Sequence, residues 1–350
     1  IALSADGGRL VYLGPGAEGG QLWLRERDRL DATPLSGTAG AINPFFSPDG
    51  QQIGFSTGAN NELKVIPVTG GPGVTLAEGG LGSGGGGVWG FDGWIYFDSP
   101  GGYLRVRASG GTPELIAPLD TARREVGLAW PDALPNGRGL LLRSRRNLSV
   151  DDFEIVAFDL RSRQRHVLTK GLLARYVAPG YIVIVRADGT LVAAPFDQDR
   201  LALTGPATPI LEGVMTKPFG SVDIAISGDG TLIYVPGGAN PAGGVGEIAW
   251  VGRDGSERSL DPPLAVNPSP NYGLALSPDG TRLALDILSQ RSVDIWIKQL
   301  PSGPFSRLTF EGGVNMRPSW TADSKSILYL SDRNGRTAVW RQRADGSSAA

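Results

Sequence analysis

The sequence contains no cysteine and a single histidine in 350 residues. Disulfides and thiolate metal sites are therefore excluded, while the redox compartment stays undetermined. His166 lies in a basic turn segment, residues 161–166, without the partner residues that metal sites and Ser–His catalysis usually need. We expect it to be a solvated turn residue.

Long apolar runs are missing as well. Runs such as residues 181–185 are far shorter than the roughly 20 residues that a membrane-spanning helix needs. The 33 basic and 35 acidic residues nearly balance, giving a net charge of −2. A general nucleic-acid-binding protein would carry a basic surplus, so we expect no nucleic-acid partner. Any membrane attachment would have to come from a helix of the parent chain outside this sequence.

Common catalytic and cofactor motifs are also absent. We find no H-E-x-x-H, G-x-S-x-G, Walker A or kinase-type H-R-D and D-F-G. Residues 80–85 fit G-x-G-x-x-G, but a strand-like segment follows where a dinucleotide site needs a helix, so we expect a loop. Asp151 and Asp152 lack the oxygen-rich spacing of a calcium loop. We predict no enzyme activity and no cofactor, calcium being an alternative that the sequence does not support.

Glycine (52 residues) and proline (26 residues) are abundant, and they recur in a turn pattern that resembles Ser-Pro-Asp-Gly. The clearest copies are residues 4–7, 47–50, 227–230, 277–280 and 321–324, with degenerate copies at 91–93, 134–137 and 178–180. Their closing positions, 7, 50, 93, 137, 180, 230, 280 and 324, lie 43 to 50 residues apart. A four-stranded propeller blade takes about 40–45 residues.

The chemistry of this turn explains its composition. Proline presets φ, aspartate can hydrogen-bond the local backbone, and glycine accepts a positive φ. Ser324 stands in the glycine position of the last copy. A non-glycine residue in the left-handed region costs about 1 kcal/mol, so the last turn is predicted to be either strained or different in type.

Strand-like segments follow each turn. The segment directly after the turn is short and apolar, such as 9–13, and the one after it alternates between apolar and polar residues, such as 21–24. A Gly-rich turn then leads to the fourth strand of the blade, such as 73–76. We predict an all-β fold, a β-propeller of four-stranded antiparallel blades. Eight blades fit best, with seven or six as alternatives because repeats five and six run long. The predicted single domain covers residues 1–350, with repeats beginning near 1, 43, 87, 127, 174, 222, 272 and 316.

Three tryptophans support the alignment of the repeats. Trp23, Trp296 and Trp340 each lie 16 residues after the closing position of their turn. We expect these indoles to pack between neighbouring blades. After Trp340 the sequence runs for ten more residues, so the last blade is expected to lack its fourth strand. Closure would then occur through packing alone or with residues outside this sequence.

Two surfaces are candidates for binding. Residues 138–170 hold eight lysines and arginines and four acids, which suggests either an anion-docking edge or a charged surface guarding exposed strand edges. Loops on a rigid scaffold often carry binding residues, and residues before each innermost strand should rim one mouth of a central channel. The candidates at this mouth are Asn43, Arg123, Glu125, Arg175, Asp223, Tyr272, Asn315 and Arg317.

The repeat resembles the TolB-type propeller. A longer set of segments, in order, is similar to the repeat region of bacterial eukaryotic-like serine/threonine kinases: residues 37–50, 174–180, 189–197, 248–255, 294–296 and 306–309. In that family a cytoplasmic kinase is joined by a membrane helix to an extracytoplasmic propeller. The resemblance implies a non-catalytic sensor propeller with a protein, peptide or small-molecule ligand. A TolB-like periplasmic scaffold is one alternative, and a propeller lyase or lactonase is another.

Overall fold

The computed structural model consists of β-strands with one short 3₁₀ helix, η1 (Val150–Asp152), in the part of the chain that it describes. The described residues are 1–16, 20–57, 62–78, 86–146, 149–217, 220–222, 224–228, 230–237, 246–251, 254, 256–259, 265–266, 273–288, 292–334 and 337–350. Within these ranges, no helix is long and apolar enough to cross a membrane.

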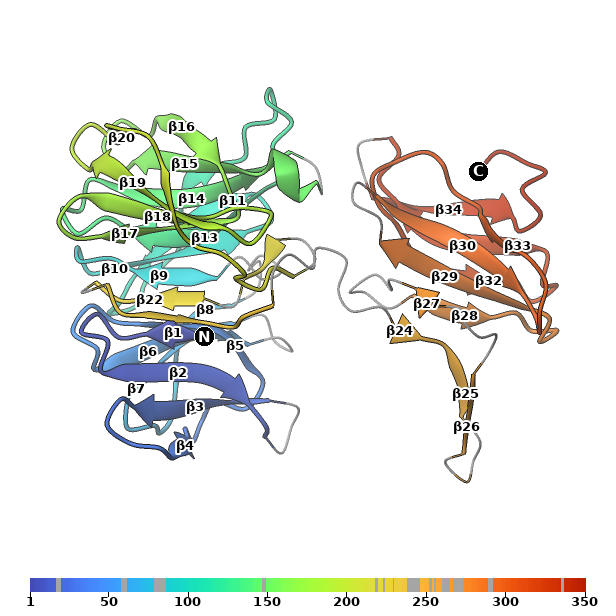
Figure 1. The fold of residues 1–350 in the computed structure, drawn as a ribbon, viewed down its shortest axis with the longest axis horizontal. Helices are drawn as coiled ribbons and strands as arrows, with labels where there is room; N and C mark the ends of the chain where they lie inside the picture. Colours follow the sequence, from blue (N-terminus) through green and yellow to red (C-terminus); the bar gives the residue numbers. More distant parts are fainter. Residues whose placement is uncertain are drawn as a thin grey trace. The chain divides into compact units, whose positions relative to one another are not determined.

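The chain divides into two compact units. The first comprises Ile1–Asn147, Asp151–Thr216 and Ser221–Ala239. The second comprises Asn240–Ala350 with the short segments Leu148–Val150 and Lys217–Gly220. We refer to them as unit 1 and unit 2, and to each sheet by the repeat that forms it, from blade 1 to blade 8 (Figure 1).

The first three blades of unit 1 are four-stranded antiparallel meanders. Blade 1 contains β1 (Ala2–Leu3), β2 (Arg9–Gly14), β3 (Gln21–Glu26) and β4 (Ala32–Pro34). Blade 2 contains β5 (Ala41–Phe46), β6 (Gln52–Thr57), β7 (Glu62–Pro67) and β8 (Val74–Glu78). Blade 3 contains β9 (Gly87–Trp89), β10 (Trp94–Ser99), β11 (Gly102–Arg107) and β12 (Glu114–Pro118).

The remaining blades of unit 1 vary in size. Blade 4 contains β13 (Gly127–Ala133), β14 (Gly139–Arg145), β15 (Glu154–Asp159) and β16 (Arg165–Lys170). Blade 5 contains β17 (Leu173–Val177), β18 (Tyr181–Val185) and β19 (Leu191–Asp197), with β20 (Ala202–Leu203) and β21 (Thr208–Leu211) both pairing with β19. Blade 6 contains two described strands, β22 (Ile224–Ile226) and β23 (Leu232–Tyr234).

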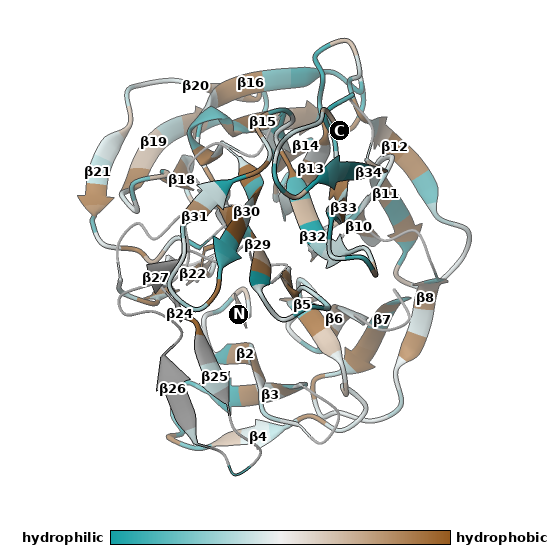
Figure 2. Ribbon diagram, turned by 90° about the vertical axis from the view of Figure 1, so that its right-hand side faces the viewer, coloured by the Kyte–Doolittle hydropathy of each residue, from teal (hydrophilic) through white to brown (hydrophobic). Residues whose placement is uncertain are grey.

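The innermost strands of unit 1 form a closed circle. Going round it, β1, β5, β9, β13 and β17 are successive neighbours, β22 and β23 pack against blade 5, and β22 lies beside β1. Across this last junction, the N–H of Gly228 donates to the carbonyl of Ala5 at 3.1 Å. In Figure 2 the strands of blade 2 run outward from β5 to β8, and β4, β8, β12, β16 and β21 lie at the periphery.

Unit 2 contains two larger sheets. Blade 7 has β28 (Leu274–Leu276), β29 (Arg282–Leu288), β30 (Val293–Gln299) and β31 (Phe305–Arg307). Blade 8 has β32 (Asn315–Trp320), β33 (Ser326–Ser331) and β34 (Ala338–Arg343). Between blades 6 and 7 in the sequence, two strand pairs form: β24 (Gly246–Glu247) with β27 (Ala265–Val266), and β25 (Ala249–Val251) with β26 (Glu257–Ser259).

Apolar side chains from adjacent sheets form the cores. In unit 1, Leu22 of blade 1 and Phe55 of blade 2 are fully buried in one shared cluster. In unit 2, Ile295 of blade 7 and Ile327 of blade 8 are buried together. Because each sheet buries one face against its neighbour, the repeat sequence is stabilised chiefly by stacking of blades. The prediction of an all-β propeller with four-stranded antiparallel blades is confirmed.

The recurring turn has the chemistry expected of it. In the first copy, the Ser4 hydroxyl donates to Asp6 Oδ1 at 2.6 Å, and Asp6 accepts the N–H of Gly8 at 3.0 Å. Ser324 has a φ of +58° within the same hydrogen-bonded turn, close to the +65° of Gly7. Of the two alternatives for the last copy, the strained turn is therefore the one that forms.

The three aligned tryptophans all occupy the third strand of their blades, and all are half-buried. Trp340 packs against the cluster shared by blades 7 and 8. Trp23 donates from Nε1 to the Pro15 carbonyl at 2.9 Å, and Trp296 lies against Phe305 with ring centroids 5.0 Å apart. Packing between blades thus describes Trp340, whereas the recorded contacts of the other two lie within their own blades.

Candidate binding site

A β-bulge interrupts the innermost strand in three blades. At each bulge a non-glycine residue with positive φ precedes a proline: Asn43 (+51°), Trp130 (+55°) and Arg317 (+55°). Such backbone conformations are strained, and they persist only where the surroundings hold them in place. The bulges re-aim side chains at the start of the innermost strand, the region where sequence analysis predicts a channel mouth.

Trp130 fills space near the centre of unit 1. Its side chain is half-buried and packs against the cluster of blades 5 and 6 that includes Leu191 and Ile224. A Cβ added to Gly86 of blade 3 would lie 4.0 Å from the Trp130 ring and 3.9 Å from Asn43. The bulges of blades 2 and 4 therefore meet around the Gly86 backbone, and apolar packing occupies this part of the centre.

Arg175 on β17 stabilises the same bulge. Its guanidinium donates to the carbonyls of Pro131 at 3.1 Å and of Trp130 at 3.4 Å, and lies 3.9 Å from the Asp132 carboxylate. Asp132 also accepts the Tyr176 N–H at 2.7 Å. Burial raises the pKa of Asp132, while Arg175 opposes that shift. Arg175 thus connects blades 4 and 5 rather than projecting freely from the channel mouth.

Glu125 organises the loop that precedes β13. Its carboxylate accepts hydrogen bonds from the Ser144 hydroxyl at 2.6 Å, the Asp120 N–H at 2.9 Å and the Arg165 guanidinium. The residue is only 7% exposed, so its charge depends on these partners for stabilisation. This carboxylate fixes the loop against β14 and β16.

The tip of the same loop is exposed and basic. Arg123 and Arg124 are exposed, and the apolar side chain of Val126 is 52% exposed. Arg123 lies 3.6 Å from the carboxylate of Glu154, which also pairs with Arg146 at 2.6 Å. We call the exposed set Arg123, Arg124, Val126 and Arg146 the blade-4 rim.

A buried arginine lies beneath the rim. Arg143 is 5% exposed, with its guanidinium 4.8 Å from the Phe153 ring and 5.8 Å from the Trp130 ring. Burial, with a smaller contribution from Arg145, lowers the pKa of Arg143 to about 9. Burial also lowers the pKa of Arg145, an effect that Asp98 opposes. The faces of these aromatic rings contribute to stabilising the positive charge of the buried guanidinium.

The candidates of unit 2 lie together on β32. Asn315 is buried and donates from Nδ2 to Asp294 at 3.3 Å and to the Glu311 carbonyl at 3.0 Å. The Arg317 N–H donates to the buried carboxylate of Asp286 at 3.0 Å. Burial raises the pKa of Asp286, and the N–H groups of Arg317 and Gly273 oppose that shift. Asn315 is thus part of the packing of the blade, whereas the Arg317 side chain is exposed.

The predicted channel-mouth residues therefore divide into groups. Arg123 and Glu125 share one loop, with Arg175 on the adjacent blade and Asn43 two blades away, while Asn315 and Arg317 belong to unit 2. Asp223 and Tyr272 lie outside the described residues, as does the segment 80–85. Trp130, Asp132 and Arg143 were not among the residues predicted from the sequence. The sequence does carry a signal for the three bulges. At a similar distance before the recurring turn, each of these blades has a residue followed by proline: Asn43-Pro44, Trp130-Pro131 and Arg317-Pro318.

The basic segment 138–170 is largely engaged within unit 1. Arg138 pairs with Asp159 at 2.7 Å, and Lys170 with Asp152 at 3.3 Å. Arg163 donates to the carbonyls of Leu115 and Ile116 at 3.4 and 3.5 Å, covering the outermost strand of blade 3. This contact protects a strand edge.

His166 lies on β16, paired with Ala157, rather than in a turn. No group of three His, Cys, Asp or Glu suited to a metal ion occurs in the described ranges.

The radial sheets and closed circle of inner strands define unit 1 as a β-propeller. Residues 264–350 of the chain match the TolB beta propeller domain family (PD40), and blades 7 and 8 lie within this match. These C-terminal repeats are thus similar to those of TolB-type propellers.

The chain is similar to the uncharacterized protein Atu1656 of Agrobacterium fabrum, with 27% identity over 198 residues. The match covers 55% of this chain and 63% of the relative.

Solved propeller structures are similar at low identity. TolB from Acinetobacter baumannii is 15% identical, with 98% of this chain and 63% of that chain covered and a TM-score of 0.29. The Cps50 (Swd1) β-propeller domain of Myceliophteria thermophila is 11% identical, with 97% and 95% covered and a TM-score of 0.41. An oligogalacturonate lyase from Vibrio parahaemolyticus is 11% identical, with 98% and 88% covered and a TM-score of 0.39. Because these sequence identities and TM-scores are low, the assignment of a propeller rests on the strand order and arrangement of the sheets in this chain.

Proposed function

We propose that this chain is a non-catalytic propeller scaffold that binds a protein or peptide partner at the blade-4 rim. The observation that carries the proposal is the loop before β13, which is fixed from below by Glu125 and presents exposed arginines above. A rigid loop loses little conformational entropy on binding, which favours its use as a recognition surface.

The rim has a composition suited to an acidic protein surface. Arginine is enriched among residues that dominate binding energy at protein interfaces, and Arg123 and Arg124 stand beside exposed Val126. Glu154 neutralises part of the charge of Arg123 and Arg146, so Arg124 is the strongest candidate for a direct contact. The partner is expected to supply carboxylates around a small apolar contact.

The finer proposal is a sensor propeller of a receptor-like bacterial serine/threonine kinase, located outside the cytoplasm. The ordered set of family-like segments supports it, and the TolB-type C-terminal repeats are compatible with it. A TolB-like periplasmic scaffold has the same support from these repeats. Sequencing the parent gene upstream of the codon for Ile1 separates the two, because the kinase hypothesis requires an apolar helix and kinase motifs there.

Site-specific photocrosslinking tests the binding surface. A photoreactive amino acid replaces Arg123 in the native cells, and the control replaces Gln51, an exposed residue of a hairpin turn in blade 2. We expect a discrete protein adduct from position 123 that Arg124→Glu diminishes and that position 51 does not give. Identical adducts from both positions, or none from position 123, would refute binding at the rim.

A further inference from the structure

One arginine of blade 4 differs from its counterparts in unit 1. Arg145, the last residue of β14, is half-buried, and its side chain makes no hydrogen bond or ion pair with the described residues. The other described half-buried arginines of unit 1 each donate to a carboxylate or a carbonyl: Arg9 to Gly50, Arg105 to Glu114, Arg138 to Asp159, Arg165 to Glu125 and Arg175 to Pro131. Arg145 is thus an exception to the rule that a charge taken partly out of water has a partner.

The guanidinium of Arg145 lies over a glycine of the innermost strand. Gly127 pairs with Arg145 across β13 and β14, and a Cβ added to Gly127 would lie 2.7 Å from Arg145 Nε and 3.4 Å from Arg145 Cζ. The φ of Gly127 lies outside the left-handed region, so the backbone here does not require glycine. What glycine provides is space, because a side chain at position 127 would displace the guanidinium.

The positive charge at this place is only partly compensated. Burial lowers the pKa of Arg145, and the Asp98 carboxylate of β10 opposes that shift. Arg143 lies two residues before Arg145, on the same face of β14, and after burial the charge of Arg145 is the further cause that lowers the pKa of Arg143. A single negative charge placed beside Arg145 would therefore stabilise both guanidiniums.

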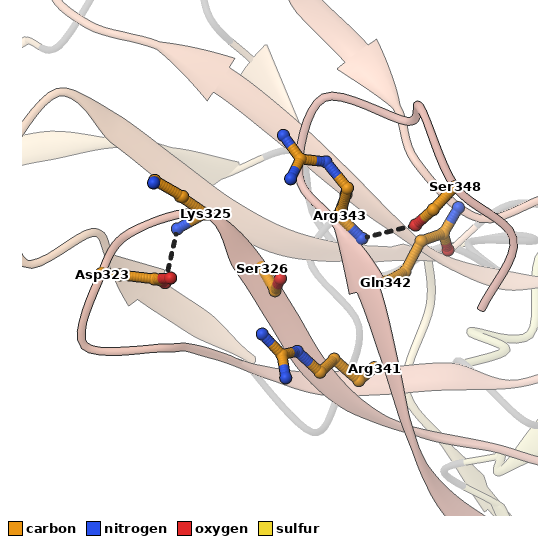
Figure 3. Close-up of a pocket in the computed structure, with 7 residues that line it drawn as sticks. All are labelled: Asp323, Lys325, Ser326, Arg341, Gln342, Arg343 and Ser348. Atoms are coloured by element: carbon orange, nitrogen blue, oxygen red, sulfur yellow. Dashed lines mark hydrogen bonds between the residues drawn. The ribbon is translucent and has the colours of Figure 1, made fainter.

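Exposed cations of unit 2 show why partial burial matters here. Lys325 and Arg341 line a pocket of about 290 Å³, and both residues are exposed (Figure 3). Water solvates such side chains, so an ion pair added at an exposed site contributes little. A half-buried guanidinium is solvated less, and a carboxylate beside it contributes correspondingly more.

Arg145 adjoins the blade-4 rim. The Val126 N–H donates to the Arg145 carbonyl at 2.8 Å, and Gly127 directly follows Val126 in the chain. The 52% exposed side chain of Val126 therefore belongs to the residue next to the one over which the guanidinium lies. Arginines that dominate binding energy are typically desolvated and surrounded by weaker contacts, which is the position of Arg145 relative to the rim.

The chemistry of this position favours a carboxylate as the ligand. The planar N–H groups of a guanidinium donate in parallel to the two oxygens of a carboxylate. A phosphate group would bring about two negative charges to a position that the Asp98 carboxylate already influences. The charge balance therefore favours a monoanion, which is the charge of a glutamate or aspartate side chain.

We propose that Arg145 binds a glutamate or aspartate side chain of the partner protein, which enters beside Val126 and lies against the guanidinium over Gly127. This contact presupposes the function proposed for the rim and identifies the group of the partner that the rim recognises. Arg123 and Arg124 then contact the exposed surroundings of that acidic residue, whereas Arg145 contacts its carboxylate.

Peptide binding tests the contact directly. The probe is the pentapeptide Gly-Leu-Glu-Leu-Gly with blocked termini and a neutral fluorophore, and its isosteric comparison has glutamine in place of glutamate. Binding to the whole chain is followed by fluorescence anisotropy. We expect the glutamate peptide to bind with a Kd of about 100 μM, and the glutamine peptide to bind about tenfold more weakly because the charge-assisted contact is lost.

Variants of the two paired residues test the geometry. Arg145→Lys keeps the positive charge and loses the fork of N–H groups, so it should weaken the glutamate peptide about tenfold and change the glutamine peptide by about twofold or less. Gly127→Ala should act in the same direction, because its Cβ displaces the guanidinium. The matched control is Arg29→Lys at a 73% exposed arginine of blade 1, which should leave both affinities unchanged. Cooperative thermal unfolding of each variant shows that it is folded.

Modification of arginine gives a readout on the unaltered chain. Phenylglyoxal reacts with accessible guanidiniums, and mass spectrometry locates each adduct. The glutamate peptide should slow the modification of Arg145 and not that of Arg29, and the glutamine peptide should protect neither. Equal protection by the two peptides would overturn the proposal, as would a lack of saturable binding up to about 1 mM. Tighter binding of a phosphoserine version of the peptide would overturn the assignment to a carboxylate.

The crosslinking assay separates this contact from the function of the rim. Arg145→Lys should diminish the adduct formed from position 123. An adduct unchanged by Arg145→Lys, with both peptides bound equally, would overturn the contact and leave binding at the rim in place. Binding of the glutamate peptide that depends on Arg145, without any adduct in cells, would support the contact and refute the rim as the site of a native protein partner.

Discussion

Units 1 and 2 are built from the same repeat but differ in how their outer sheets end. In unit 1 the inner strands return from β22 to β1, so the first and last sheets cover each other. In unit 2, blades 7 and 8 share one core, while Leu274 and Val339 on other faces are 56% and 69% exposed. The repeat therefore specifies a sheet and its turn, whereas closure depends on complementary faces at the two ends.

The difference has an energetic consequence. Burying a leucine or valine side chain stabilises a fold by about 1.5–3 kcal/mol. Unit 1 obtains this contribution at the five junctions from blade 1 to blade 6, and a backbone hydrogen bond from Gly228 to Ala5 joins blade 6 to blade 1. Unit 2 obtains it at the junction of blades 7 and 8 through residues such as Ile295 and Ile327. Unit 1 should consequently be the more independent folding unit.

Separate expression of the two units gives the largest expected effect. Residues 1–237 should unfold cooperatively on heating and elute as a monomer, because their sheets close on themselves. Residues 246–350 should unfold with little cooperativity or associate through their exposed leucines and valines. Circular dichroism melts and size-exclusion chromatography measure both properties. A non-cooperative 1–237 fragment would contradict the closed circle.

Removing the buried carboxylate of the loop before β13 should give the next largest effect. Glu125→Ala removes the acceptor of the Ser144 hydroxyl and the carboxylate partner of Arg165, which keeps its hydrogen bond to the Pro118 carbonyl. The loss should lower the free energy of unfolding by about 3 kcal/mol. Urea titration gives the magnitude. Hydrogen exchange should show the loss in blade 4 and not in blade 8.

The comparison is an ion pair of unit 2 with an exposed carboxylate. The Glu311 side chain is 69% exposed and pairs with Arg333, which is 16% exposed. Glu311→Ala should lower the unfolding free energy by about 1 kcal/mol or less, because the carboxylate is solvated. If the two substitutions had equal effects, Glu125 would not be the residue that organises its loop.

Much of the fold could be predicted because its determinants are local. The Ser-x-Asp-Gly turn forms through bonds between residues two apart, such as Ser4 to Asp6, so its spacing marks the blades directly. Closure could not be predicted in this way. The junction of Gly228 with Ala5 joins residues more than 200 positions apart, and neither residue has a side chain from which the contact could be predicted.

The candidate site was predicted only in part, for a related reason. The position of Arg175 near a mouth follows from its place at the start of an innermost strand, but its use by the Trp130 and Pro131 carbonyls depends on a bulge in another blade. Composition marked Glu125 as polar, whereas its burial depends on Arg165 and Ser144, 40 and 19 residues away.

The turns allow a smaller test at equivalent positions of the two units. Gly50 has a φ of +66°, and an added Cβ would meet nothing closer than 3.6 Å, so Gly50→Ala should destabilise unit 1 by about 1 kcal/mol through conformation alone. Ser324 already carries that strain, but its hydroxyl accepts the Asp279 N–H of the preceding blade at 3.2 Å.

The two contributions at Ser324 can be separated by substitution. Ser324→Ala keeps the strain and loses the hydrogen bond, so it should destabilise unit 2 by about 1 kcal/mol. Ser324→Gly loses both, and its net effect should lie near zero. Urea midpoints of the three variants measure these differences. A stabilising Ser324→Ala would show that the contact between blades 7 and 8 contributes nothing.

Acidification should give the smallest effect, and it should fall more heavily on unit 2. The serine or threonine hydroxyl of each turn, followed by the backbone, lowers the pKa of Asp6 and Asp49 in unit 1 and of Asp279 and Asp323 in unit 2. A carboxyl with a lowered pKa in the folded state stabilises the fold above its unfolded pKa of about 3.9, and this contribution is lost as the pH falls through the lower folded value. Both large sheets of unit 2 carry such a hydroxyl-bonded aspartate. In the described part of unit 1, blades 1 and 2 carry one, and Asp159 and Asp197 have pKa values lowered chiefly by backbone N–H groups. Amide protection between pH 5 and pH 2 should therefore decline first in blades 7 and 8, where both sheets have the hydroxyl contact. Asp279→Asn and Ser277→Ala should each flatten that decline, since one removes the titrating group and the other removes the main cause of its shift, whereas an unchanged pH profile in both would exclude the turn as its origin.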